Sequence, residues 1–210
     1  MKKFELTTET ITNAVGKKLF RIKALVEFEN VKAGELGGYV EKEGNVSQDD
    51  NAWVSGDAWV YGDARVSGNA EVYGNAEVSG NAKVSGGVRV SGNAEVYGNA
   101  WASGNARVSG NARLSGNTEV SGNARLSGNA RLSGNTDYAL VQGFGTEFRC
   151  TTFYRDKNKK IMVNCGCFHG DLEEFRKQVK ETRSGKIAKE YLMIADLMEY
   201  HFASEDSGDE

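Results

Sequence analysis

The segment Asn51-Ala-Trp-Val-Ser-Gly56 begins a six-residue motif that repeats without insertion or deletion as far as Gly134. Fourteen copies follow one another, and every copy ends in glycine. Alanine holds the second position in all but two copies, and valine or leucine holds the fourth position in all but one. Self-similarity at a fixed short period is typical of a solenoid in which each repeat packs against its neighbours.

Within one copy the residue types indicate a short β-strand followed by a turn. Side chains of a strand alternate between its two faces, so the second and fourth positions share one face and the third and fifth share the other. Glycine followed by asparagine is typical of a turn, because both residues tolerate a positive φ. The pattern therefore predicts an interior of alanine and valine, and an outer surface formed by the variable third position.

Units such as Val78-Ser-Gly-Asn-Ala-Lys83 closely match a known motif, and the chain resembles hexapeptide-repeat proteins. The resemblance implies a mainly β fold, a left-handed parallel β-helix shaped as a triangular prism with three hexapeptides in each coil. We expect about five to six coils, spaced roughly 4.8 Å apart as in any parallel sheet.

The segments on either side of the repeats divide the chain further. We expect an N-terminal capping segment over residues 1–30, the parallel β-helix over 31–140, a small α+β cap or assembly domain over 141–203, and a disordered acidic tail over 204–210. In the first segment, Phe20-Arg-Ile-Lys-Ala-Leu25 alternates as a strand does.

The opening coil of the β-helix is irregular. Val40 and Val46 are six residues apart, as in the repeat, but Val46 and Val54 are eight apart. Two extra residues near Gln48 are therefore expected to bulge before the strict register begins. A segment that covers this end would shield strand edges that otherwise invite aggregation.

The C-terminal segment predicts a ββαα arrangement. Residues 146–155 and 160–165 are expected to form two strands. Asp171, with Glu174 three residues later, fits a capping box at the start of a helix. A second helix is expected after Gly185, with Ile187, Tyr191, Ile194 and Met198 on one apolar face.

Composition limits the classes of function. The chain has 210 residues, a formal net charge of -3 and no proline. This near-neutral balance does not favour nucleic acid as a partner. No apolar run is long enough to span a membrane, and Met1-Lys-Lys-Phe-Glu5 lacks an apolar signal core. We therefore expect a cytoplasmic protein without membrane association, whose three cysteines are reduced thiols.

Three stretches ahead of the strict repeats also resemble a module of phage and prophage hexapeptide-repeat proteins of unassigned function. The resemblance covers roughly residues 20–140. The stretches that carry it are Arg21-Ile-Lys-Ala-Leu25, Val31-Lys-Ala-Gly-Glu-Leu-Gly-Gly-Tyr-Val40 and Asn45-Val-Ser-Gln48.

The outward positions are the surface that is available for binding. Stacking three hexapeptides per coil places arginines in one row, where they would repel one another unless an anion or a partner carboxylate lies between them. Exposed aromatic residues of the same surface are of the kind enriched at interfaces. The residues predicted to carry recognition are Arg89, Arg107, Arg125, Trp53, Trp59, Trp101, Tyr61 and Tyr97.

Catalysis and metal binding have fewer candidates. The resemblance to hexapeptide-repeat proteins implies two main types of enzyme. One is the acyltransferases, which use an imidazole as general base, and the other is the carbonic anhydrases, which bind zinc through three histidines. The chain has two histidines, His169 and His201, both outside the repeats. Cys165, Cys167 and His169, with Cys150 as a fourth ligand, are weak candidates for a metal site. The alternative is that the thiols fill the core of the cap and His169 lies in a turn, and we expect no metal or other cofactor.

These observations favour a non-enzymatic protein, a rigid scaffold that binds a protein partner. The resemblance suggests a phage- or prophage-encoded protein, with inhibition of a host defence component as a specialised version, and self-association as a dimer or trimer. Two alternatives stay open: a degenerate hexapeptide acyltransferase and a self-assembling filament protein.

Overall fold

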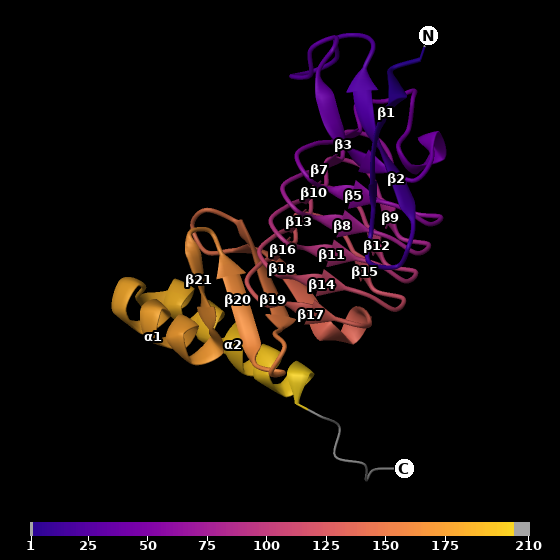
Figure 1. Ribbon diagram of the computed structural model, residues 1–210. Helices are drawn as coiled ribbons and strands as arrows, with labels where there is room; N and C mark the ends of the chain where they lie inside the picture. Colours follow the sequence, from indigo (N-terminus) through magenta and orange to yellow (C-terminus); the bar gives the residue numbers. More distant parts are fainter. Residues whose placement is uncertain (1, 204–210) are drawn as a thin grey trace. The chain divides into compact units, whose positions relative to one another are not determined.

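The computed structural model describes residues 2–203 (Figure 1). The chain separates into two compact units, the first ending at Asn135 and the second beginning at Thr136. The acidic tail predicted for residues 204–210 lies outside the described residues.

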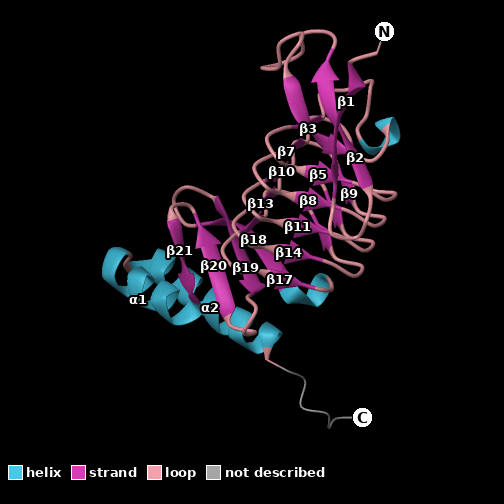
Figure 2. Cartoon of the chain, viewed as in Figure 1, coloured by secondary structure: helices cyan, strands magenta, loops and turns pink. Residues whose placement is uncertain are grey.

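The repeats of the first unit form a β-solenoid of stacked parallel coils, as the sequence predicts (Figure 2). Each hexapeptide contributes a two-residue strand made of its third and fourth positions. The strands are β4 (Trp53–Val54), β5 (Trp59–Val60), β6 (Arg65–Val66), β7 (Glu71–Val72), β8 (Glu77–Val78), β9 (Lys83–Val84), β10 (Arg89–Val90), β11 (Glu95–Val96), β12 (Trp101–Ala102), β13 (Arg107–Val108), β14 (Arg113–Leu114), β15 (Glu119–Val120), β16 (Arg125–Leu126) and β17 (Arg131–Leu132).

Every third strand pairs, so the coil has three faces. One face holds β4, β7, β10, β13 and β16, a second holds β6, β9, β12 and β15, and the third holds β5, β8, β11, β14 and β17. Arg89 pairs with Arg107, and Val90 with Val108, which is the register expected for three hexapeptides per coil. Identical positions of the repeat therefore stack directly above one another.

The interior is formed by the alanine and the valine or leucine of each copy, which are buried as predicted. The turn glycine is required for two reasons, as Gly104 illustrates. Its φ is +69°, which L-residues with a side chain rarely adopt, and a Cβ there would lie 2.8 Å from the backbone nitrogen of Gly122 in the next coil. The glycines thus allow the corners of successive coils to come into contact.

Asparagine at the first position of the repeat links the corners. The amide of Asn75 donates to the carboxamide oxygen of Asn93 at 3.2 Å, and Asn93 donates in the same way to Asn111 at 3.1 Å. A second such ladder joins Asn81 and Asn99 at 3.0 Å.

Ahead of the repeats, three longer strands extend the third face. They are β1 (Phe4–Thr12), β2 (Lys18–Ala24) and β3 (Leu36–Val40), joined antiparallel, and β3 then pairs in parallel with β5. The strand predicted around Phe20 is confirmed as β2, whereas β1 was not expected. A short 3-10 helix, η1 (Glu43–Asn45), follows.

The predicted two-residue insertion is confirmed by the pairing of the first coil. Tyr39 pairs with Trp59 and Val46 with Val66, a sequence separation larger by two than that of Arg89 and Arg107. The extra residues therefore lie between Val46 and the first strict repeat.

The polarity of the coil hydrogen bonds decides what each end of the solenoid needs. The N–H groups of one coil donate to the carbonyls of the next, as from Arg89 to Ala106 at 3.0 Å. The first coil consequently has carbonyls without a preceding donor, and the last coil has N–H groups without an acceptor.

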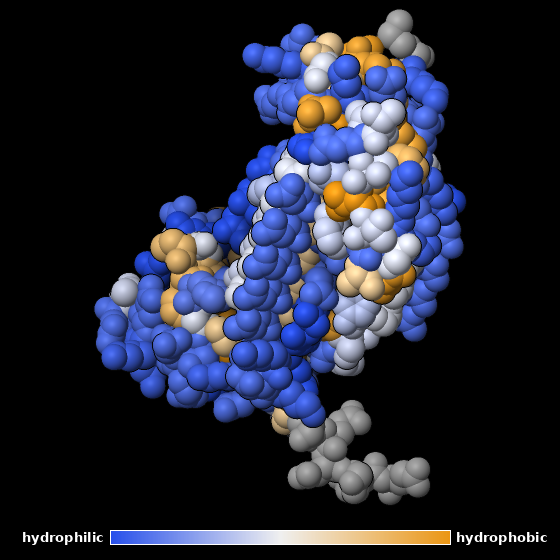
Figure 3. Space-filling model, in the orientation of Figure 1, coloured by the Kyte–Doolittle hydropathy of each residue, from blue (hydrophilic) through white to orange (hydrophobic). Residues whose placement is uncertain are grey.

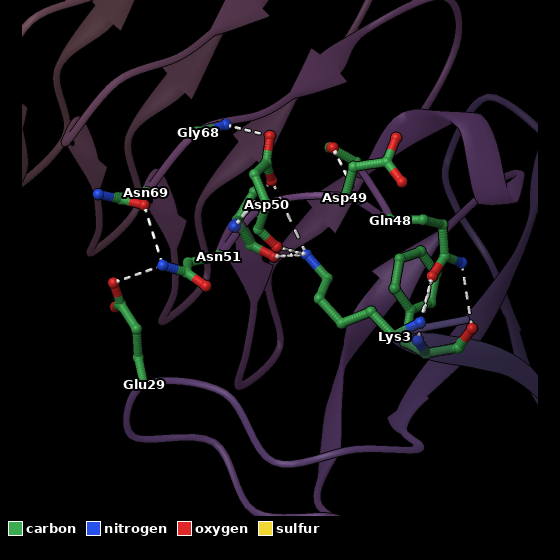
Figure 4. Close-up of polar contacts among 11 residues, drawn as sticks. Lys3, Glu29, Gln48, Asp49, Asp50, Asn51, Gly68 and Asn69 are labelled. Carbon is green, nitrogen blue, oxygen red and sulfur yellow. Dashed lines mark hydrogen bonds and ion pairs between the residues drawn. The ribbon is translucent and has the colours of Figure 1, made fainter. Parts of the chain in front are cut away.

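Side-chain donors pair with the carbonyls of the first coils, and a side-chain acceptor pairs with an N–H group near the last coil. At the start, the Lys3 ammonium donates to the carbonyls of Asp50 at 2.6 Å and Ala52 at 2.8 Å (Figure 4). The amide of Asn45 donates to the carbonyl of Ala64 at 2.9 Å. At the other end, the carboxamide oxygen of Asn135 accepts from the N–H of Glu119 at 2.7 Å.

Lys3 is the most buried charged group of this network, with 4% of its surface exposed. Burial lowers the pKa of its ammonium group, and the negative charge of Asp50 opposes that shift. The ring of Phe28 lies 5.0 Å from the ammonium, in cation–π contact. Gln48, also drawn in Figure 4, accepts from the N–H of Lys3 at 2.8 Å and so holds β1 against the insertion.

We predict that Lys3→Met lowers the free energy of unfolding of the solenoid by about 2–4 kcal/mol, because one buried and one partly buried carbonyl lose their donor. The matched control is Lys2→Met, which removes an exposed ion pair with Glu43 worth at most about 1 kcal/mol. Urea denaturation followed by circular dichroism measures both. Equal stability of the two variants would contradict the role assigned to Lys3.

The second unit is a four-stranded antiparallel sheet with two helices. The sheet order is β18 (Tyr138–Phe144), β19 (Arg149–Arg155), β20 (Ile161–Cys165) and β21 (Phe168–Asp171). A 3-10 helix, η2 (Asn135–Asp137), precedes the sheet, and the helices α1 (Leu172–Thr182) and α2 (Gly185–Phe202) follow it. No helix within residues 2–203 has the length and apolar character needed to cross a membrane.

The two predicted strands and two helices are present, and β18 and β21 add two strands that the sequence did not reveal. The predicted apolar faces of the helices are buried against Phe153 and Val163 of the sheet. Asp171 caps α1 as expected, accepting from the N–H of Glu174 at 2.8 Å, while the Glu174 carboxylate accepts from the N–H of Asp171 at 2.9 Å.

Asp171 also forms an ion pair with Lys160 at 2.5 Å. The hydrogen bond from Lys160, together with the one from the N–H of Glu174, holds the pKa of Asp171 below its usual value of 3.8. Ionised Asp171 therefore stabilises the folded unit above the unfolded pKa, and this contribution is lost as the pH falls through the lower, folded pKa.

We predict that Asp171→Asn costs about 0.5–1 kcal/mol at neutral pH and nothing once the pH is below the folded pKa of Asp171. Asparagine retains the cap, so the difference reports the charge alone. The helical circular dichroism signal follows the second unit, which contains α1 and α2. Glu181→Gln, a charge removal at the far end of α1, is the control, and a pH-independent deficit in Asp171→Asn would refute the linkage.

Candidate functional site

The outward third positions of the repeats form three rows along the solenoid, as predicted. We call one of them the arginine face: the row of β4, β7, β10, β13 and β16, which consists of Trp53, Glu71, Arg89, Arg107 and Arg125. Figure 3 shows that hydrophilic side chains gather in bands that run along the solenoid on the side in view. The repeat thus converts a six-residue pattern into continuous polar rows.

The arginines of this face do not form an unrelieved row of like charge, which corrects the sequence prediction. The Nε atom of Arg89 lies 3.3 Å from a carboxylate oxygen of Glu71 one coil earlier. Arg107 lies between Arg89 and Arg125 and is exposed. Among the described residues, no hydrogen bond or ion pair engages the Arg107 guanidinium.

The third face repeats the same order of acid before arginine. Glu95 and Arg113, one coil apart, form an ion pair at 2.7 Å. Tyr61 lies beside this row and donates a short hydrogen bond to Glu77. Burial, followed by the nearby Glu77 carboxylate, raises the pKa of Tyr61 to about 12. The hydroxyl is therefore fixed as a donor to the row and is not an acid in the physiological range.

The predicted aromatic residues differ in their exposure. Trp101 is 44% exposed, and its indole N–H donates to Ser85 at 3.3 Å. Tyr97 is also exposed, and Trp59 is half-buried. These three residues are available to a partner.

Trp53 was predicted to be an exposed anchor, and that prediction is wrong. It is 6% exposed because β1 and the loop before β3 cover it. Its ring makes edge contacts with Phe28 at 5.5 Å and with Phe4 at 6.4 Å between ring centres. The repeat pattern gives no sign of this burial, since the covering residues are far away in the sequence.

A cavity of about 280 Å³ lies beside Trp53 at the start of the arginine face. Phe28 and Tyr73 supply aromatic surface, and the carboxylates of Glu29, Glu35 and Glu71 line it as well. Aromatic faces and carboxylates together suit a cationic side chain. The arginine face is therefore acidic and aromatic where it begins and basic further along.

The sequence cluster around Cys165 is divided by a hairpin turn. Cys165 ends β20, Cys167 is exposed in the turn, and His169 lies on β21 opposite Asn164. Cys165 packs on the core beneath the helices. Because Cys165 and Asn164 are neighbours on one strand, the face that carries His169 is the opposite one.

These positions do not support a metal centre. His169 is within 3.2 Å of the Tyr154 hydroxyl, which also accepts from the amide of Asn164 at 3.3 Å. The metal-site candidates Cys165, Cys167 and His169 do not lie on a single strand, so they do not share one face. Within residues 2–203 no three His, Cys, Asp or Glu side chains are grouped so as to hold a metal ion.

Comparisons with known proteins leave the function open. No protein-family model matches the chain, and no curated protein is significantly similar to it. The function must therefore be argued from the surface of the molecule itself.

We predict that Trp53 and Trp101 differ strongly in how much stability is lost when each is truncated to alanine. Trp53→Ala should cost about 3–5 kcal/mol of stability, because it empties a buried aromatic cluster. Trp101→Ala should cost less than about 1 kcal/mol, because the ring is on the surface. Urea denaturation of both variants measures the contrast, and a Trp53→Ala protein as stable as the wild type would contradict the burial described above.

Proposed function

We propose that this protein is a non-enzymatic scaffold whose solenoid binds a protein partner through the arginine face. The observation that carries the proposal is the exposed Arg107 guanidinium, which has no partner of its own among the described residues and lies between two further arginines on a rigid row. Planar guanidinium groups bind carboxylates in a bidentate geometry that flexible lysines do not match.

Rigidity supports this role. The backbone of each coil is hydrogen-bonded to the next. The backbone that carries the arginine face therefore loses little conformational entropy when a partner binds. Arg89 is already oriented by Glu71. The neighbouring Arg107 and Arg125 are then the part of the row best suited to carboxylates of the partner.

The charge order along the face narrows the kind of partner. Carboxylates and aromatic rings surround the cavity beside Trp53, whereas arginines follow from β10 onward. A partner with a cationic side chain at one end and carboxylates at the other would complement both regions. A second copy of the chain, related by a two-fold axis across the face, meets this condition.

The resemblance of residues 20–140 to phage and prophage hexapeptide-repeat proteins extends the proposal to a phage-encoded protein that occupies a host protein, including a defence component. The filament alternative is less well supported, because side chains such as Lys3 and Asn45 already satisfy first-coil carbonyls that axial stacking would use. The acyltransferase alternative would need a general base, and the imidazole of His169 is engaged with Tyr154.

We predict that Arg107→Glu weakens partner binding at least tenfold, because it replaces an attraction for carboxylates with a repulsion. The variant should keep its fold, since the new carboxylate lies between Arg89 and Arg125. Arg65→Glu makes the same charge change on a different face and is the matched control. Sedimentation velocity of the purified chain tests self-association, and quantitative affinity capture from bacterial lysate tests other proteins.

Comparing Arg107→Glu with Arg65→Glu decides whether the arginine face binds the partner. Loss of self-association or of specific captured proteins with Arg107→Glu, but not with Arg65→Glu, supports the arginine face. Identical behaviour of wild type and both variants in both assays would remove it. Calorimetric titration with acetyl-CoA tests the enzymatic alternative, for which a scaffold gives no binding heat.

A further inference from the structure

The second unit contains a cavity that the proposed function does not use. Its volume is about 70 Å³, and it lies among β19, the β20–β21 turn and the two helices. Because one water occupies about 30 Å³ of liquid volume, the space accepts a chemical group of only a few heavy atoms. Residues of one compact unit line it throughout: Thr146, Glu147, Arg149, Cys165, Cys167, Phe168, Phe175, Gln178, Val179, Thr182, Arg183 and Tyr191.

Two arginines and one glutamate line this cavity. The Arg149 guanidinium lies over Gly166, where a Cβ would be 2.6 Å from its Nη1 atom and 3.3 Å from its Cζ atom. It therefore lies directly above the turn that joins Cys165 to Cys167. Its ion pair with Glu147 is long, at 4.0 Å. Arg183, at the end of α1, adds a second guanidinium and leaves the lining with a net positive charge.

The hydroxyl of Tyr191 lines the cavity together with both arginines. Tyr191 of α2 donates to the carbonyl of Phe144 at 3.3 Å. Burial is the main cause that raises the pKa of Tyr191, and the nearby Cys165 is the second. The charges of Arg183 and Arg149 oppose this rise. Arg149, Arg183 and Tyr191 all line the same small cavity, which is the geometric observation that brings the three side chains together.

The inner wall is apolar and preformed. Phe168 and Phe175 lie with ring centres 5.5 Å apart, and Val179 is buried next to them. A small preformed space with an apolar wall and a few convergent polar groups is the usual form of a ligand site. Here the polar groups include two guanidiniums, the Tyr191 hydroxyl and the Gln178 amide, with Glu147 as the one carboxylate.

We propose that this cavity binds an oxyanion group the size of a carboxylate or a phosphate, held between Arg149 and Arg183. Each guanidinium offers two parallel donors to such a group, and the low polarity of the inner wall strengthens the attraction. The bound group lies beside the thiols of the turn, and an apolar substituent attached to it would pack against Phe168.

The thiols provide a direct readout. Cys167 is exposed at the cavity, while Cys165 accepts a hydrogen bond from Thr151 at 3.1 Å. Cys150 precedes Thr151 on β19, so its side chain points to the opposite face of the sheet. Cys150 therefore faces away from the cavity and is an internal control thiol.

The test alkylates the full-length chain with iodoacetate, which carries a carboxylate, and in parallel with iodoacetamide, which is neutral and nearly the same size. In both reactions the thiolate sulfur bonds to the CH₂ carbon and iodide leaves. Mass spectrometry of peptides gives the rate at each cysteine. The iodoacetate-to-iodoacetamide rate ratio should be at least tenfold higher at Cys167 than at Cys150, and it should fall as salt screens the arginines.

Arg149→Gln and Arg183→Gln should each lower the Cys167 ratio about tenfold, because each removes a charge-assisted contact. Lys157→Gln removes the same charge from the β19–β20 turn, at the other end of β20, and should leave the ratio unchanged. Comparing the two reagents removes any effect of the substitutions on the thiol itself. Circular dichroism verifies that the variants are folded.

Two competitors distinguish the chemical source of the oxyanion. Inorganic phosphate or acetate should slow carboxymethylation of Cys167, and the more effective of the two identifies the preferred group. Equal ratios at Cys167 and Cys150, or no change in either arginine variant, would overturn the proposal. The result is independent of the arginine face of the solenoid, since Arg107→Glu should leave these ratios unaltered.

Discussion

The hydrogen bonds between successive coils are the constraint on which the first unit depends. Each strand of the repeats, β4 to β17, is only two residues long, and a strand of that length has no stability of its own. Stability comes from repetition in register, because the N–H groups of one coil all find carbonyls in the next. The close approach that this requires explains why glycine is invariant at the corner and why alanine and valine alternate inside.

The same ladder creates two chemically different ends. Carbonyls remain at the beginning and N–H groups at the end, so a lysine ammonium and an asparagine amide serve the first, and an asparagine oxygen serves the second. The residues that supply these partners lie outside the repeat. A solenoid of this kind therefore needs special sequence only where the repetition stops.

Stacking also aligns the residues at the variable third position of the repeat in rows on the surface. An acid placed one coil before an arginine gives an ion pair between coils, as Glu71 and Arg89 or Glu95 and Arg113 show. The row from Arg89 to Arg125 then leaves Arg107 as the guanidinium with the greatest capacity for an external carboxylate. The small cavity of the second unit offers the same chemistry in a different geometry, with Arg149 and Arg183 lining one small space instead of a flat face.

The six-residue pattern by itself determined the solenoid, the buried positions and the composition of the three rows, because these depend only on local alternation and a constant register. The break in the six-residue spacing also determined the insertion after Val46. The spacing of Asp171 and Glu174, outside the repeats, determined the capping box of α1, because such a box is a local feature. Tertiary structure alone decided that Trp53 is buried, since Phe4 and Phe28 come from segments with no pattern linking them to the repeat. It likewise decided that Cys165 and His169 lie on opposite faces, because a hairpin turn separates two residues that are only four apart in the sequence. The site formed by Arg149 and Arg183 was not predictable, because it brings together a strand, a turn and two helices whose packing no sequence spacing encodes.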